Sequence, residues 1–365
     1  MRLRPGSKAL IRDINTNLVL DVIRRYGPCA RAEIVERTRL SRSTVTEILA
    51  GLDQEGLLAT SGKAGSSGGR RAELIRLEPL ARLSAGFALG GGRLLGVLLD
   101  LYGQPVARLS RSLCPDLTAL GLAEALRSGL YPLLEQVGAC PDRLTGCGLA
   151  LSGQIDPREG MVLDAPQLGW QHLPLETLLG EILGLPVSLA SSAQALALAE
   201  RRHGPYPGAE SLLALWLDES VSVAVIADGR LILGRSGGGG DLSHWPAHTG
   251  SRRCTCGRRG CLRTVAAEPA VREAPTEGAE ALGHALAGLA AALSPEAIIV
   301  GGPLPASAGP LLLDPLRHAI RSHSPPGLEP LPVLAGRLGE EAPAVGAALA
   351  VQERFFQPPV YESPW

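Results

Sequence analysis

Three cysteines and one histidine gather in a short stretch of this 365-residue chain. His244 stands ten residues before a segment that reads Cys254-Thr-Cys256-Gly-Arg-Arg-Gly-Cys261. Three thiolates and an imidazole make a complete four-coordinate zinc site, with no open position for a catalytic water. The spacing therefore predicts a structural Zn²⁺ ion held by His244, Cys254, Cys256 and Cys261.

Two alternatives to this zinc site stay open. His248 could replace His244 as the fourth ligand on spacing grounds, or the three cysteines could be redox-active or merely buried. The other cysteines are scattered, which is typical of small buried side chains in a cytosolic protein. They are Cys29, Cys114, Cys140 and Cys147.

A second set of chemically useful residues lies near the N-terminus. Ser41 can cap a helix in which Val45, Ile48, Leu49 and Leu52 share one apolar face. The opposite face is polar, and Arg, Ser and Thr side chains on an exposed helix can reach base edges and phosphates in a DNA major groove. The predicted DNA contacts on this helix are Ser41, Arg42, Ser43, Thr44 and Thr46.

Neighbouring segments complete the outline of a winged helix-turn-helix domain over residues 1–80. Residues 13–26 and 30–38 are predicted helices, because apolar residues recur at helical spacing. In the first helix the inward set is Leu18, Val19, Val22 and Ile23.

Residues 56–78 indicate two short strands around a glycine-rich basic loop, the wing. On that loop, Arg70 and Arg71 can reach the DNA backbone or the minor groove. The alternative for the whole domain is a small helical module that binds another protein.

Charge and composition agree with a nucleic-acid partner and exclude a membrane span. Residues 1–80 hold 14 Lys and Arg against 9 Asp and Glu, whereas the remainder holds 21 against 27. A basic end on an acidic body favours a polyanion partner for that end. No apolar run reaches the roughly 18 residues of a membrane helix, and no secretory signal is visible. We therefore expect a cytoplasmic protein.

From about residue 83 onwards the chain alternates strands and helices, which predicts an α/β architecture. Residues 86–110 indicate a hairpin of two strands with a Tyr-Gly turn. Residues 117–137 indicate a helix kinked or interrupted at Pro132. Further strands are expected around 212–233 and 296–302, and helices over 279–293 and 343–354.

The cysteine segment, taken together with several others, resembles the ROK family of sugar kinases and repressors. GFALGGGRLLGVLLDLYGQPV is similar to the family's first phosphate-binding hairpin, and LSGQIDPREGMVLDAPQLGW to its sugar-site loop. SPEAIIVGG is similar to its adenosine-side strand. LSRSTVTEILAGLDQEGLL and GGRRAELIRL resemble the DNA-binding domain that only the family's regulators carry. The resemblance covers almost the whole chain.

This resemblance implies a fold and a domain plan. We expect a winged helix-turn-helix domain (1–80) followed by an actin/hexokinase-like, two-lobed α/β domain (81–365). One lobe would comprise residues 81–190 plus 343–365, and the other residues 191–342.

Departures from the family pattern predict that kinase activity is lost. Ser192 replaces the aspartate that acts as general base in the family's kinases, and losing such a base costs about 10²–10⁴ in rate. Ala88 replaces an aspartate of the first hairpin. Asp218 and Glu219 lie where the kinases have a glycine-rich phosphate loop, and two carboxylates would repel a triphosphate.

The sugar site implied by the resemblance is altered as well. Asp241 and Arg263 stand where the family has glutamates, and Ser191 and Ser192 replace two further hydroxyl-binding groups. Gly153, Asp241 and His244 are the surviving candidates for ligand binding. The ligand would then be an altered sugar, another small molecule, or none, in which case the domain only dimerises.

The DNA-binding half departs less from the family. Arg39 stands where a glycine is usual, so its backbone must tolerate or avoid a positive φ. Ala30 replaces the usual serine cap of the second helix. Residues 267–280 also stand where the family has a longer helical stretch.

Together these observations predict a transcriptional regulator of carbohydrate-related genes, with repression the commoner outcome in the regulators it resembles. It would bind a pseudo-palindromic operator in double-stranded DNA as a homodimer or higher even oligomer, with a sugar or other small molecule as possible effector. The alternatives are a ROK-type sugar kinase with an appended DNA-binding domain, and a zinc-stabilised interaction scaffold.

Overall fold

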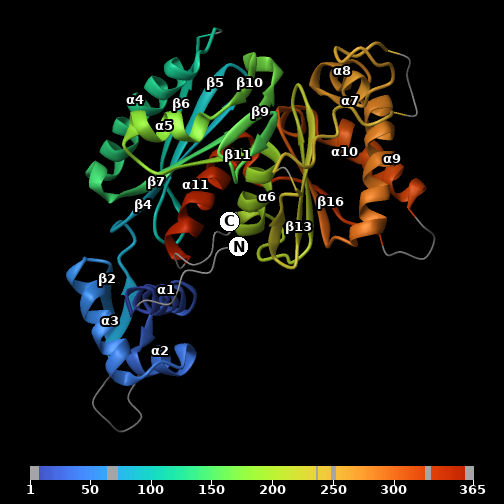
Figure 1. Ribbon diagram of the computed structural model, residues 1–365. Coiled ribbons are helices and arrows are strands. Elements are labelled where there is room, and N and C mark those ends of the chain that lie inside the picture. Colours follow the sequence, from blue (N-terminus) through green and yellow to red (C-terminus); the bar gives the residue numbers. More distant parts are fainter. Residues whose placement is uncertain are drawn as a thin grey trace.

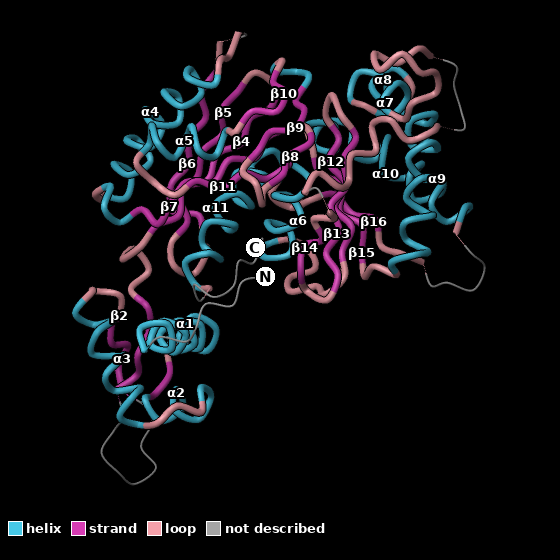
Figure 2. Tube along the Cα trace, in the orientation of Figure 1, coloured by secondary structure: helices cyan, strands magenta, loops and turns pink. Residues whose placement is uncertain are grey.

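The computed structural model describes residues 8–63, 73–114, 116–235, 237–247, 252–324 and 330–357, without the side chains of residues 269 and 304–310. A small N-terminal domain precedes a larger body built on two five-stranded sheets (Figure 1, Figure 2). This arrangement confirms the fold class predicted from the sequence. None of the described helices is long and apolar enough to cross a membrane.

The N-terminal domain consists of three helices and a small antiparallel sheet of order β1-β3-β2. Its core includes Val19, Ile23, Ile34 and Leu49, all buried. Leu18 is 39% exposed, so its predicted inward position is wrong, and Leu20 is buried instead. The elements are α1 (Lys8–Tyr26), β1 (Cys29–Ala30), α2 (Arg31–Thr38), α3 (Arg42–Gln54), β2 (Leu58–Lys63) and β3 (Glu73–Leu77).

The first lobe is built on a mixed sheet of order β11-β7-β4-β5-β6. Helices α4 (Ala119–Val137) and α5 (Leu175–Leu183) cover the outer face (Figure 1). The strands are β4 (Leu83–Gly90), β5 (Arg93–Leu99), β6 (Pro105–Ser112), β7 (Leu144–Leu151) and β11 (Val187–Ser191). A second sheet of this lobe contains β8 (Gln154–Asp156), β9 (Met161–Ala165) and β10 (Trp170–Leu173).

Two local predictions for this lobe need correction. The segment expected as a two-stranded hairpin is a three-stranded meander, because Gly91 and Gly92 make a second turn, between β4 and β5. Pro132 does not interrupt α4, since residues on both sides of it belong to one helix. Its ring lies in a helix whose inner face is packed into the core at Leu130, Leu133 and Leu134.

The second lobe carries a sheet of order β14-β13-β12-β15-β16. Helices α9 (Pro275–Leu293) and α10 (Pro303–His323) lie on its outer side, and the short helices α7 (Arg263–Ala266) and α8 (Glu268–Glu273) lie near one end (Figure 1). The strands are β12 (Leu212–Leu217), β13 (Val221–Ala227), β14 (Arg230–Ile232), β15 (Ala297–Gly301) and β16 (Val333–Ala335).

Two alanine-rich helices, α6 (Ser192–His203) and α11 (Ala342–Phe356), fill the space between the two sheets. They approach backbone to backbone: a Cβ atom on Gly346 would lie 1.8 Å from the carbonyl oxygen of Ala195. The sheet approaches α11 as closely, because a Cβ atom on Gly148 would lie 2.0 Å from the carbonyl oxygen of Ala347. Only glycine fits at these two positions.

The N-terminal domain is attached to this body through the end of α11 and the turn between β5 and β6. Phe356 and Leu101 are buried in the core of the N-terminal domain. The guanidinium of Arg24 lies 4.2 Å from the centre of the Phe356 ring and pairs with Glu353 at 3.2 Å. The Leu77 N–H donates to the Tyr102 hydroxyl oxygen at 3.1 Å.

The close approach of α6 and α11 gives a stability prediction. A methyl group at position 346 must push the helices apart, so Gly346→Ala should lower the free energy of unfolding by about 1–3 kcal/mol. Gly288→Ala is the matched control, because a Cβ atom at this position of α9 meets nothing within 4 Å. That substitution should be neutral or stabilise by about 0.5–1 kcal/mol. Equal denaturation midpoints for the two variants would contradict the prediction.

Candidate functional site

The predicted metal ligands come together in one loop of the second lobe. His244, Cys254, Cys256 and Cys261 offer ligand atoms that all lie within 4.8 Å of one another. Short backbone contacts fold the loop: the Cys254 N–H donates to the Arg258 carbonyl oxygen at 2.8 Å, and Pro246 bridges to Cys261. His248 lies outside the described residues, so the choice between His248 and His244 as the fourth ligand stays open.

The distances within this cluster suit a tetrahedral ion. The His244 Nδ1 and Cys254 Sγ atoms are 3.6 Å apart, as are the Sγ atoms of Cys256 and Cys261. Zn–S bonds of about 2.3 Å in a tetrahedron place neighbouring sulfurs about 3.8 Å apart, whereas a disulfide would bring them to about 2.05 Å. The donor set therefore fits a metal ion such as Zn²⁺ and does not fit a disulfide.

The thiols of the cluster differ in acidity. Hydrogen bonds from the backbone and side chain of Arg258 lower the pKa of the exposed Cys256 thiol to about 6. Burial raises the pKa of the Cys261 thiol to about 11. A cation would have to displace the proton from Cys261, which is the usual consequence of thiolate coordination.

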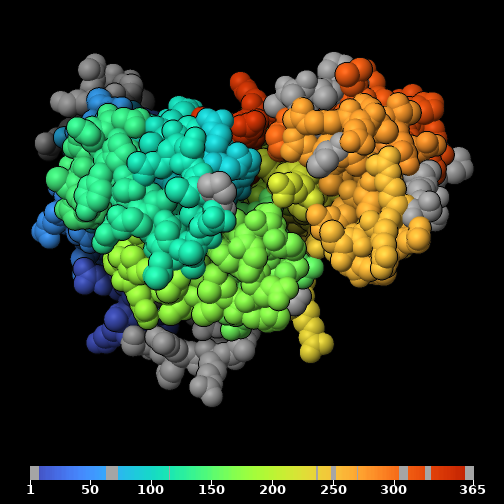
Figure 3. Space-filling view, turned by 90° about the horizontal axis from the view of Figure 1, so that it is seen from above, coloured from blue at the N-terminus to red at the C-terminus, as the bar shows by residue number. Residues whose placement is uncertain are grey.

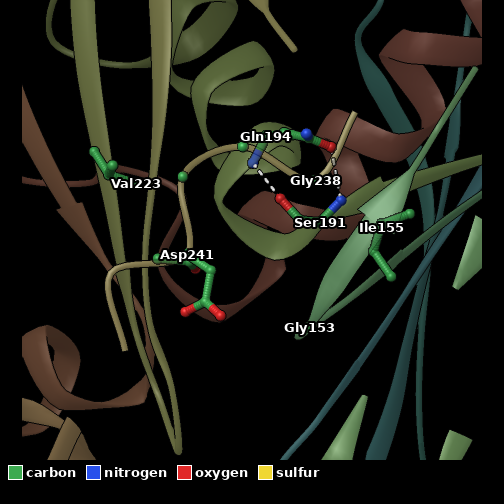
Figure 4. Close-up of a pocket in the computed structure, with 10 residues that line it drawn as sticks. Gly153, Ile155, Ser191, Gln194, Val223, Gly238 and Asp241 are labelled. Atoms are coloured by element: carbon green, nitrogen blue, oxygen red, sulfur yellow. Dashed lines mark hydrogen bonds between the residues drawn. The ribbon is translucent and has the colours of Figure 1, made fainter. Parts of the chain in front are cut away.

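The candidate ligand pocket lies between the two lobes. Gly153 and Ile155 line it from the first lobe, and Val223 and Asp241 line it from the second, with Ser191 and Gln194 of the α6 end between them (Figure 4). The cavity that remains is about 10 Å³. A volume of this size holds about one water molecule.

A glycine-rich loop closes one side of this pocket. Gly240 has φ +102°, and a Cβ atom there would lie 1.9 Å from the carbonyl oxygen of Val223. The Gln194 side chain donates to the carbonyl oxygen of Gly237 at 3.1 Å, which ties the loop to the start of α6. Ser191 caps α6, and its hydroxyl accepts the Gln194 N–H at 3.2 Å.

Two of the three predicted ligand-binding residues line this pocket and the third does not. Gly153 and Asp241 are lining residues, whereas His244 belongs to the cysteine cluster. Arg263, expected to disturb the sugar site, donates to the Glu219 carbonyl oxygen at 3.2 Å and lines a separate surface groove with Arg252.

Serine hydroxyl groups lie at the position where the family's kinases carry the general base. The Ser192 hydroxyl is buried, and its oxygen lies 3.1 Å from the Ser152 hydroxyl oxygen. The Ser152 hydroxyl in turn donates to the carboxylate of Asp218. Ala88 is buried on β4 and offers no ligand atom. The charge of Asp218 is therefore engaged in hydrogen bonds, an arrangement that sequence reasoning missed.

The predicted DNA-contacting residues of α3 share one exposed face. Ser41 is the N-cap, and its hydroxyl accepts the Thr44 N–H at 3.1 Å. Arg42, Ser43 and Thr46 are exposed, and Thr44 is half-buried, whereas Val45, Ile48, Leu49 and Leu52 are buried as predicted.

The turn that precedes α3 decides between the two alternatives for Arg39, tolerating or avoiding a positive φ. Arg39 has φ +58°, and its N–H donates to the Val35 carbonyl oxygen. The Glu33 carboxylate accepts the Ala30 N–H at 2.8 Å, so the start of α2 keeps one side-chain hydrogen bond although Ala30 offers none. Arg70 and Arg71 lie outside the described residues, between the paired strands β2 and β3.

A helix-turn-helix domain with a paired hairpin, placed before two α/β lobes that face each other across a cleft, defines a regulator-type member of the sugar-kinase fold. The chain belongs to the ROK family, whose sequence model matches residues 84–280.

Curated relatives and solved structures agree with this placement. The chain is 26% identical to a xylose repressor of Bacillus spizizenii, over 96% of this chain and 98% of that protein. It is 28% identical to the DNA-binding transcriptional dual regulator NagC of Escherichia coli, over 73% of this chain and 66% of that protein.

Two solved structures show the same fold. A ROK family transcriptional regulator, a homologue of the E. coli MLC protein, superposes with a TM-score of 0.79 at 24% identity and covers 95% of this chain and 97% of its own. A ROK family glucokinase from Streptomyces griseus, solved with glucose and AMPPNP, has a TM-score of 0.64 at 25% identity. It covers 73% of this chain and 98% of its own.

Proposed function

We propose that this protein is a DNA-binding transcriptional repressor of carbohydrate-related genes, with an effector-sensing or dimerising body derived from a sugar kinase. The observation that carries the proposal is the exposed polar face of α3 in a helix-turn-helix domain attached to a ROK body. Relatives that carry names of repressors, including one matched along 98% of its length, support it. The regulator would act as a homodimer or higher even oligomer, because a pseudo-palindromic operator requires paired recognition helices.

Loss of kinase activity is part of this proposal. A serine hydroxyl near neutral pH cannot take the proton of a sugar hydroxyl as a carboxylate does. In this chain Ser192 also shares a hydrogen bond with Ser152, whose own proton is directed at Asp218. Among the described residues, the carboxylate that this hydrogen-bond chain reaches from Ser192 is that of Asp218, which already accepts the Ser152 proton.

The metal is proposed to be Zn²⁺ with a structural role. The four ligands leave no coordination position for substrate, and three thiolates favour a soft or borderline cation. His244 lies three residues after Asp241, a pocket-lining residue, so the ion would fix the loop that forms one side of the pocket.

Binding to the gene's own upstream DNA tests the proposal most directly. We expect specific binding that weakens steeply as salt increases, because phosphate contacts release counterions. Release of the DNA by one sugar in a panel would identify the effector. Failure to bind any DNA even at low salt would overturn the proposed function and favour the interaction scaffold.

The role of the exposed polar face of α3 in DNA binding can be tested by replacing one arginine. Arg42→Ala should weaken operator binding about tenfold and reduce the salt slope by about one, if Arg42 contacts a phosphate. Arg127→Ala is the matched control, because this exposed arginine lies on α4, in the first lobe. Unchanged affinity and slope in the Arg42 variant would remove this residue from the interface.

Protein purified without chelator should contain one zinc ion per chain, measured by elemental analysis. Cys261→Ala should lose the ion and lower the melting temperature, because a buried ligand is removed. Cys140→Ala is the control, since Cys140 is exposed and distant in sequence from the cluster. A wild-type preparation that holds no metal would disprove the zinc site.

ATP consumption with a panel of hexoses tests the loss of catalysis. Wild-type protein should consume no ATP above the buffer rate. Restoring a carboxylate in Ser192→Asp should not restore activity, because Ala88 and the loop at Asp218 also differ from the kinases. Sugar-dependent ATP consumption by the wild-type protein would favour the alternative of a kinase with an appended DNA-binding domain.

A further inference from the structure

Asp218 is the centre of a hydrogen-bond network at the cleft. Its Oδ2 atom accepts the Trp216 Nε1–H at 2.8 Å and the Ser152 hydroxyl, and its Oδ1 atom accepts the Ser220 N–H and hydroxyl, both at 2.8 Å. Four donors thus point at one carboxylate. Hydrogen bonds to an ionised acceptor are about twice as strong as those between neutral groups.

This network joins the two lobes. Asp218, Trp216 and Ser220 belong to the β12–β13 region of the second lobe, whereas Ser152 lies directly after β7 of the first lobe. The Ser152 hydroxyl has a single proton, which it gives to Asp218, so Ser192 must be the donor in the Ser192–Ser152 contact. The Ser192 contact thereby adds the start of α6 to the hydrogen-bond network.

A second carboxylate bridges the lobes on the other side of Gly153. The Gln154 amide, on β8 of the first lobe, donates to Asp241 Oδ2 at 3.0 Å. Asp241 Oδ1 accepts the Ser243 N–H at 2.9 Å, so the carboxylate is held in place within the second lobe. The pocket that Asp241 lines retains about 10 Å³. Figure 3 shows the two lobes side by side.

We propose that Asp218 is the main latch of the cleft: it holds the lobes together through Ser152, assisted by Asp241 and Gln154, and a ligand enters only by replacing these hydrogen bonds. Both bridging acceptors are carboxylates. A ligand that replaces these contacts must therefore supply hydrogen-bond donors to the two carboxylates. The latch does not rest on the proposed function.

Hydrogen–deuterium exchange of the full-length protein tests the latch. Asp218→Asn keeps the shape of the side chain but leaves one carbonyl oxygen for four donors. Exchange of amides in residues 153–156 of the first lobe should become at least about tenfold faster, because a charge-assisted contact across the cleft is lost. Glu219→Gln is the matched control: it makes the same chemical change on the adjacent, exposed carboxylate.

Gln154→Ala is a second variant that opens the other bridge without altering Asp218. It should accelerate exchange around Asp241, whereas Gln171→Ala, which removes a contact confined to the first lobe, should not. Exchange in α4 and the thermal midpoint serve as measures of global folding. Unchanged exchange across the cleft in both Asp218→Asn and Gln154→Ala would overturn the latch.

The exchange experiments use no DNA, so failure of the latch and failure of the proposed regulator are distinguished.

Discussion

Helices α6 and α11 touch backbone to backbone between the two sheets, and both lobes and the N-terminal domain are attached to one of them. The contact depends on small residues, because any side chain at Gly346 would meet the Ala195 carbonyl group. Close-packed interiors change between discrete arrangements and do not deform continuously. A movement of the lobes must therefore carry α6 and α11 with it as rigid units.

Helix α6 joins the cleft to the DNA-binding half of the molecule. At its start, Ser191 and Ser192 face the pocket region. At its end, Arg202 donates to the Tyr102 carbonyl oxygen at 2.7 Å, and His203 lies 2.8 Å from the Gly103 carbonyl oxygen. Tyr102 in turn contacts Leu77 of the N-terminal domain. Twelve residues of helix, about 18 Å, thus connect the candidate ligand pocket to the base of the N-terminal domain.

The environment of this junction is partly desolvated. Burial lowers the pKa of His203 and raises the pKa of Asp100, whose carboxylate accepts the N–H groups of Tyr102 and Gln104. Both shifts have burial as their main cause. The junction also contains the guanidinium groups of Arg202 and Arg24, and Leu101 and Phe356 are buried beside it.

Much of this architecture was predictable from the sequence, because local chemistry determined it. The N-cap at Ser41 and the four-residue metal cluster follow from residue type and spacing. The latch did not follow, since Ser152 and Asp218 are far apart in the sequence and a carboxylate alone does not indicate its donors. The prediction that Leu18 faces inward was wrong for a similar reason, because neighbouring elements decide which face of α1 is buried.

The position of α11 in the chain has a consequence for synthesis on the ribosome. The N-terminal domain emerges first, yet Phe356, which completes its core, belongs to the last of the described helices. Until α11 leaves the exit tunnel, the surface that receives Phe356 stays exposed to water, and α6 lacks its packing partner. A nascent chain can therefore hold the helices of the N-terminal domain before the side chain that completes their core has emerged, so this domain and the body reach their final packing together.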